Sequence, residues 1–145
     1  MQSKEYQNFS IVRQTKGNIP NLPFFEIKND ILGKEYELSL FFPKQKLSQE
    51  LHKKWKKKDS PVNVLSFPFD EKNGEIIITL EQARREAKNY DHSYSQHLVF
   101  LFIHACLHLK GMTHGAKMEK AERNYFQKYK EQYYETKRQR KKNKH

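Results

Sequence analysis

Apolar residues alternate with polar or small ones in residues 36–42, as they do in strands that bury one face. Residues 9–13, 62–67 and 75–78 are further short apolar segments that we predict as strands. Pro43 and Pro68 follow two of them, and Asn73-Gly74, just before the last, is a strong signal for a tight turn. The pattern therefore predicts a small mixed sheet of four strands.

Helical periodicity fills the segments between and after these strands. It predicts helices at residues 48–55, 79–90, 97–110 and from about residue 117 onward. Thr79 and Gln82 have the spacing of a capping box, which favours a helix start there. Residues 97–110 are apolar nearly all round, so we expect this helix to be central and buried, with Gly111 at its end. The predicted fold is thus α+β, with helices packed on a small sheet.

The length of 145 residues suits one domain with a single core. We place this domain at residues 1–135. Residues 136–145, TKRQRKKNKH, contain six lysines and arginines and no apolar residue, so we expect a disordered basic tail.

The formal net charge is +11, from 28 lysines and arginines against 17 acidic residues. A small protein this basic usually binds an anionic partner, most often nucleic acid, and a merely solubilising charged surface is the alternative. A membrane surface is a further alternative, but no apolar run approaches the ~20 residues of a membrane-spanning helix. The first ten residues also lack the apolar stretch of a secretory signal. Cys106 is the only cysteine, which excludes an intrachain disulfide and suits a reducing cytosol.

Three of the seven histidines have the spacing of metal ligands. His104 and His108 stand at positions i and i+4 of the predicted helix, on one side and about 6 Å apart along its axis. Gly111 can take a positive φ and so bring His114 back as a third ligand. Three imidazoles leave the fourth position of a tetrahedral zinc ion open to water, which is the layout of a catalytic zinc site.

Ordinary histidines on a packed helix are the alternative, but three at these offsets with a glycine between them favour a metal site. Metzincin proteases share the spacing, yet their motif has a glutamate where this chain has Ala105, which argues against a protease. Cys106 falls on the opposite face of the helix and is expected to be a buried thiol. His97 lies about 10 Å before His104 on the same face, too far to share the ion, so we expect it at a pocket rim or as a cap.

Two segments resemble the YbeY-type bacterial endoribonuclease and rRNA-maturation family. Residues 104–114, HACLHLKGMTH, resemble the family motif His-Gly-x-Leu-His-Leu-x-Gly-Tyr-Asp-His. Residues 58–68, KDSPVNVLSFP, are similar to the family segment Lys-Asp-x-Pro-Thr-Asp/Asn-Val-Leu-Ser-Phe-Pro. The two motifs are independent of each other, which makes the resemblance specific.

Residues 74–78 also resemble the family's Gly-Asp-Ile strand, and Met118 with Glu119 and Glu122 resembles its last helix. The agreement runs over roughly residues 35–130. The resemblance implies an α+β fold, a zinc ion held by three histidines, and a cytoplasmic endoribonuclease that cuts single-stranded RNA. It further implies work in small-subunit rRNA maturation and ribosome quality control, with the small ribosomal subunit as a partner.

Several positions depart from the family motifs. Lys56 stands where the family has an arginine that takes part in RNA handling or cleavage, so Lys56 is expected to be a weakened catalytic and RNA-binding residue. Lysine keeps the charge but lacks the planar fork that grips phosphate. Lys58 is expected to neutralise phosphate charge, although a solvated helix face would explain Lys56 and Lys58 equally well. By the resemblance Ser66 lies near the metal and the RNA, and a structural serine within a strand is the alternative. The other departures are Val62 for Thr, Ala105 for Gly, Thr113 for Asp and a shorter stretch after His114.

Two other functions stay open beside the endoribonuclease. One is a non-catalytic, zinc-stabilised RNA- or ribosome-binding factor, which the loss of the arginine favours. The other is a different metallohydrolase that acts on a small anionic substrate. The open fourth position of the predicted zinc site favours an enzyme.

Overall fold

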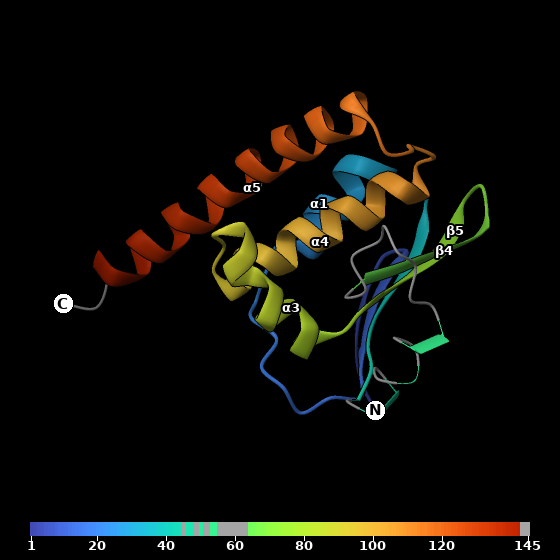
Figure 1. Ribbon diagram of the computed structural model, residues 1–145, viewed down its shortest axis with the longest axis horizontal. Helices are drawn as coiled ribbons and strands as arrows, with labels where there is room; N and C mark the ends of the chain where they lie inside the picture. The colour runs from blue at the N-terminus through green and yellow to red at the C-terminus, as the bar shows by residue number, and fades with distance from the viewer. Residues whose placement is uncertain (45, 48–49, 51–52, 55–63, 143–145) are drawn as a thin grey trace.

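The computed structural model describes residues 1–44, 46–47, 50, 53–54 and 64–142. The described strands form one mixed sheet of five strands, and the helices gather on one side of it (Figure 1). The prediction of an α+β fold is confirmed.

The strands are β1 (Gln2–Tyr6), β2 (Phe9–Arg13), β3 (Glu37–Phe42), β4 (Val64–Asp70) and β5 (Asn73–Ile78). They lie in the order β1-β2-β3-β5-β4. The inner pairs β2–β3 and β3–β5 are parallel, whereas the outer pairs β1–β2 and β4–β5 are antiparallel. In β3, Leu38, Leu40 and Phe42 are buried while the alternate residues Ser39 and Phe41 are half-buried, so one face of the sheet carries the core.

The helices are α1 (Phe24–Leu32), α3 (Leu80–Glu86), the 3-10 helix η1 (Ala87–Tyr90), α4 (Tyr94–Leu109) and α5 (Ala116–Lys142). Helix α4 contacts α1, α3, α5, β4 and β5, and Figure 1 shows it in the middle of the molecule beneath α5. Its buried side chains include Leu98, Phe102 and Leu107. Because burial of each side chain of this size stabilises the fold by roughly 1.5–3 kcal/mol, α4 contributes strongly to the stability of the core. The predicted buried central helix is therefore confirmed.

Two elements differ from the predicted pattern because their residues do not show the expected periodicity. β1 makes the sheet five-stranded instead of four-stranded; it is an edge strand whose residues are exposed except for the half-buried Tyr6, so it lacks apolar alternation. Helix α1 places Lys28 on its buried face beside Ile27 and Ile31. The Lys28 ammonium donates to the carbonyl of Lys34 at 3.2 Å, which satisfies a charge that the pattern alone would put in solvent.

Asn73-Gly74 does not form the predicted turn, because both residues lie inside β5 and the turn precedes them. A Cβ atom on Gly74 would lie 2.5 Å from the Tyr36 hydroxyl and 3.2 Å from Leu109 Cδ2. Glycine at this position therefore lets the end of α4 approach the sheet closely. Gly74 therefore marks a close contact between the sheet and α4, and not a turn.

The helix starts also differ in detail from their predicted positions. Helix α4 begins earlier than predicted because a capping box precedes it. The Ser93 hydroxyl accepts a hydrogen bond from the backbone amide of Gln96, and the Gln96 side-chain oxygen accepts one from the backbone amide of Ser93. Thr79 is the N-cap residue of α3 but makes no side-chain cap hydrogen bond, so the capping box predicted with Gln82 is absent.

Some predictions fall on residues that are only partly described. The described residues of the helix predicted at 48–55 are helical, and the others lie outside the described part of the chain. The backbone of α5 is helical to Lys142, within the segment 136–145 for which the sequence predicts disorder, and that disorder stays a prediction. Within the described ranges, no helix has both the length and the apolar character needed to cross a bilayer.

Candidate metal centre

The end of α4 turns the chain back toward the helix. Lys110 is the C-cap, and the next residue, Gly111, has a φ of 101°, which favours glycine. The Gly111 amide donates to the carbonyl of His108, and the Met112 amide donates to the carbonyl of Leu107, each at 3.0 Å. This pair of bonds is a Schellman motif. It explains physically why a glycine stands between the second and third histidines of the motif.

The structure brings His104, His108 and His114 together at this end of α4. The Nε2 atoms of His104 and His108 are 3.0 Å apart, and one nitrogen from each of the three rings lies within 4.8 Å of the others. The ligating nitrogens of a tetrahedral zinc ion, with bonds of about 2.0–2.1 Å, stand about 3.3 Å apart. Small ring rotations therefore suffice for a shared ion, and the group can hold a metal.

Glu122 of α5 belongs to this group, although its sequence position had been given no role. Its Oε1 accepts a hydrogen bond from His104 Nδ1, and both side chains are only 12% exposed. A carboxylate on Nδ1 leaves Nε2 unprotonated and free for a metal, and Nε2 is the atom that faces His108. The sequence did carry a signal, because Glu122 stands four residues from both Met118 and Phe126 on the apolar face of α5. A carboxylate on such a face needs a partner.

The protonation state of His108 suits metal binding. Burial lowers the pKa of His108, and the neighbouring His104 and His114 rings lower it further; smaller contributions from a backbone hydrogen bond with Met112 and from Glu122 act the other way. A lowered pKa favours the neutral imidazole, which is the form that binds a metal. His104 and His108 are half-buried and His114 is exposed, so the group is open to solvent on the side of His114.

Cys106 lies on the buried face of α4, as its helical position predicts. Burial raises the pKa of its thiol, which keeps the sulfur protonated and unsuited to metal binding. Across the described part of the chain, the three histidines are the one group of His, Cys, Asp and Glu side chains close enough to share an ion.

The residues predicted to contact RNA are less well placed. Lys56 and Lys58 lie outside the described residues. Ser66 is half-buried in β4, in register with Ile76 of β5. Since α4 packs against β4, the strand of Ser66 borders the helix that carries two of the histidines. The RNA-binding roles of all three residues stay predictions.

His97 is neither at a pocket rim nor a cap, so that expectation was wrong. Its side chain is fully buried, and its Nδ1 lies 3.1 Å from Nδ1 of His92. Its Nε2 makes no hydrogen bond and lies 3.7 Å from Glu86 Oε2. The rings of Tyr90 and Phe100 pack against it. Burial in this apolar setting, with a smaller contribution from His92, lowers the pKa of His97 to about 4.

Comparison with known proteins agrees with this geometry. The family model described as endoribonuclease YbeY matches residues 4–137. Endoribonuclease YbeY of Colwellia psychrerythraea is 35% identical over 97 residues, which are 62% of this chain and 63% of the relative. That of Carboxydothermus hydrogenoformans is 41% identical over 76 residues, 49% of this chain and 53% of the relative.

The protein of the same name from Finegoldia magna matches over a longer stretch, with 30% identity over 119 residues, 77% of this chain and 78% of the relative. The matches to the first two relatives span less than two thirds of their length. The family match itself covers nearly all described elements, including all three histidines and Glu122. The chain therefore belongs to the endoribonuclease YbeY family.

Proposed function

We propose that this chain is a zinc-dependent endoribonuclease that cuts single-stranded RNA and acts in small-subunit rRNA maturation and ribosome quality control in the cytoplasm. The observation that carries the proposal is the convergence of three imidazoles and one orienting carboxylate at a solvent-accessible helix end. The relatives are endoribonucleases by name, and the net charge of +11 suits a polyanionic substrate.

The chain's own residues divide the work of such a site. His104, His108 and His114 would hold the zinc ion, and Glu122 would fix the tautomer of His104. When bound, zinc supplies Lewis-acid chemistry toward water and phosphoryl oxygens. The polar contact between Glu122 and His104 is nearly dry, which strengthens it relative to a contact in water. Lys56 would supply positive charge beside the scissile phosphate.

A non-catalytic RNA- or ribosome-binding factor is the second candidate. The sequence has Lys56 where the family resemblance puts an arginine, and a lysine cannot hold two phosphate oxygens in one plane. RNA binding would persist after this change, whereas alignment of the reacting phosphate would suffer. We therefore expect slow cleavage by the present chain.

A turnover assay on zinc-analysed protein tests the proposal. The substrates are one labelled single-stranded RNA and the same strand in a duplex, at fixed salt and saturating concentration, because removal of charge also weakens binding. Lys56→Arg should speed cleavage and Lys56→Ala should slow it, with zinc content unchanged in both. His108→Ala should lose both zinc and cleavage. Equal cleavage by all variants, with or without zinc, would identify a contaminating nuclease and favour the binding factor.

A further inference from the structure

The hydrogen bond between Glu122 and His104 joins two helices, so its length depends on how α5 is seated. Glu122 belongs to α5, whereas His104 belongs to α4. On the N-terminal side of Glu122, Met118 is buried in the core. On the C-terminal side, Phe126 meets Phe100 of α4 edge-on, with ring centroids 5.9 Å apart. These apolar contacts hold α5 against α4, but a hydrogen bond fixes the position of a helix more sharply, because it weakens steeply with distance and angle.

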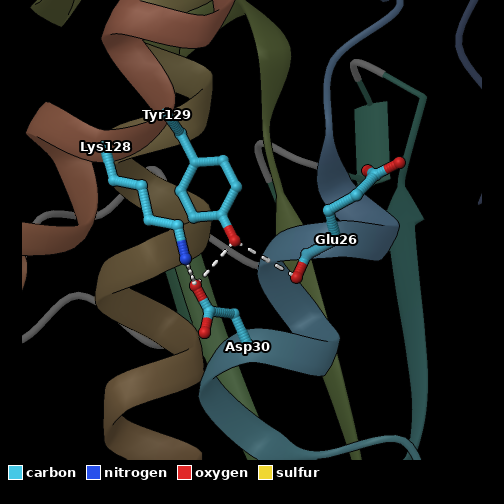
Figure 2. Close-up of polar contacts among 4 residues, drawn as sticks. All are labelled: Glu26, Asp30, Lys128 and Tyr129. Carbon is cyan, nitrogen blue, oxygen red and sulfur yellow. Dashed lines mark hydrogen bonds and ion pairs between the residues drawn. The ribbon is translucent and has the colours of Figure 1, made fainter.

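A directional contact lies seven residues beyond Glu122, about two helical turns along α5. There the Tyr129 hydroxyl, on a side chain only 3% exposed, donates to Asp30 Oδ2 at 2.7 Å and lies 3.4 Å from the carbonyl oxygen of Glu26. The Lys128 ammonium donates to the same Asp30 oxygen at 2.7 Å. Figure 2 shows both side chains of α5 reaching to one carboxylate of α1.

This contact ties α5 to α1, which itself packs on α4. Two polar contacts among the described side chains of α5 therefore fix it at two points: Glu122 meets α4, and Tyr129 meets α1. The Lys128 side chain is 52% exposed, so its ion pair contributes little beside the buried hydroxyl. A displacement of α5 by about 1 Å would stretch the bond between Glu122 and His104 beyond useful length.

We propose that Tyr129 and Asp30 are positioning residues for the metal centre: their hydrogen bond sets α5 along α4 so that Glu122 meets His104 Nδ1. The inference rests on the metal binding proposed above and adds a remote determinant of it. Neither Tyr129 nor Asp30 touches the histidines. Both act through Glu122, and this property separates them from residues that only stabilise the fold.

A double-mutant cycle on cobalt(II) affinity tests the inference. Metal-free protein is titrated with cobalt(II), whose visible absorption reports the ligand set, and thermal unfolding of each metal-free variant is measured alongside. Glu122→Gln should weaken binding about 10- to 100-fold. Tyr129→Phe should weaken it about 3- to 10-fold in the parent chain and not at all in the Glu122→Gln background, because coupled residues are not additive.

Tyr125→Phe is the matched control, since it removes the same hydroxyl one turn away on α5, and it should leave affinity within about twofold. Asp30→Asn is a second test of the contact and should match Tyr129→Phe, so the inference stays testable if one variant fails to fold. Equal affinity in Tyr129→Phe and the parent, or the same loss with and without Glu122, would overturn the inference while leaving the metal site intact. A parent chain that binds no cobalt would overturn the proposed metal site and this inference with it.

Discussion

Two histidine clusters lie two turns apart on α4. The first pairs His97 with His92 of the preceding loop, and the second joins His104 and His108 with His114 of the following loop. His97 is fully buried, whereas the second cluster reaches solvent through His114. Both clusters have a glutamate nearby, so the presence of a glutamate does not by itself separate them.

The number of rings and the hydrogen bond to the carboxylate separate the two clusters. In the first, the two Nδ1 atoms face each other at 3.1 Å, but within the described residues no third ligand group lies beside them, and Glu86 comes no closer than 3.7 Å to Nε2 of His97, which is too far for a hydrogen bond. In the second, Glu122 takes Nδ1 of His104 and leaves the Nε2 atoms of His104 and His108 converging. The second cluster therefore has three rings and a hydrogen-bonded carboxylate that holds the ring nitrogen pointing away from the ion, as metal-ligating histidines usually do.

The largest expected effect is loss of the metal from the second cluster alone. His108→Ala should lower zinc content from about one ion per chain to almost none, because two ligands are too few to hold the ion. His92→Phe should keep full zinc content, since the phenyl ring preserves the contacts that His92 makes with Tyr90 and Phe126. Elemental analysis of the purified variants gives the result. Zinc loss in His92→Phe would show that the two clusters act as one site.

The next effect is a pH dependence that belongs to the first cluster. Because the pKa of His97 is lowered to about 4 from an ordinary 6.5, the unfolded chain binds more protons than the folded chain between these values. The free energy of unfolding should fall as pH drops from 6.5 toward 4, by on the order of 3 kcal/mol across that window. Urea unfolding of the metal-free protein at pH 7.5 and 5 measures it.

His97→Phe is the matched variant for this measurement. Without the titrating ring, it should lose about 2 kcal/mol less than the parent between pH 7.5 and 5. The metal-free form is required, because protonation of the second cluster would otherwise release its ion and add a second pH dependence. An unchanged pH slope in His97→Phe would mean that the buried pair does not resist protonation.

The two glutamates provide a smaller and sharper contrast. Glu122→Gln should reduce metal affinity about 10- to 100-fold, because a neutral amide is a weaker acceptor for His104 Nδ1. Glu86→Gln should leave affinity unchanged, since Glu86 lies beside His97 of the first cluster. Competition with a chelating indicator measures both constants. Equal losses in the two variants would remove the distinction that we draw between the carboxylates.

The sequence predicts the second cluster, at the C-terminal end of α4, far better than the first. The spacing of His104 and His108 on one helix, with Gly111 at its end, is local geometry, so motif and site coincide. The helical spacing of Glu122 indicates that it needs a partner, but the choice of His104 as that partner depends on the packing of α5 on α4. The burial of His97 was not predicted, because the sequence shows its place on the helix but not the loop that brings His92 against it.

The fold shows the same division between local pattern and tertiary context. Alternation in β3 and the apolar length of α4 are visible in the sequence and are confirmed. Helix α1 is hidden because Lys28, on its core face, breaks the apolar stripe and finds its partners only in the folded chain. Gly74 reads as a turn residue until the close approach of Leu109 explains why a side chain cannot stand there.

The smallest expected effect tests whether the two clusters are independent. Phe100 lies between them: its ring centroid is 5.9 Å from that of His97 and 6.5 Å from that of His104. Phe100→Leu keeps an apolar side chain but removes the ring contacts with both clusters and with Tyr90 and Phe126, so the free energy of unfolding should fall by about 0.5–1.5 kcal/mol. Metal affinity should change less than about twofold, because Glu122 rather than Phe100 orients His104. Urea unfolding and cobalt titration of the same preparation give the two values. A tenfold loss of affinity would show that ring packing carries orientation from one cluster to the other, and the carboxylate would then not be the main difference between them.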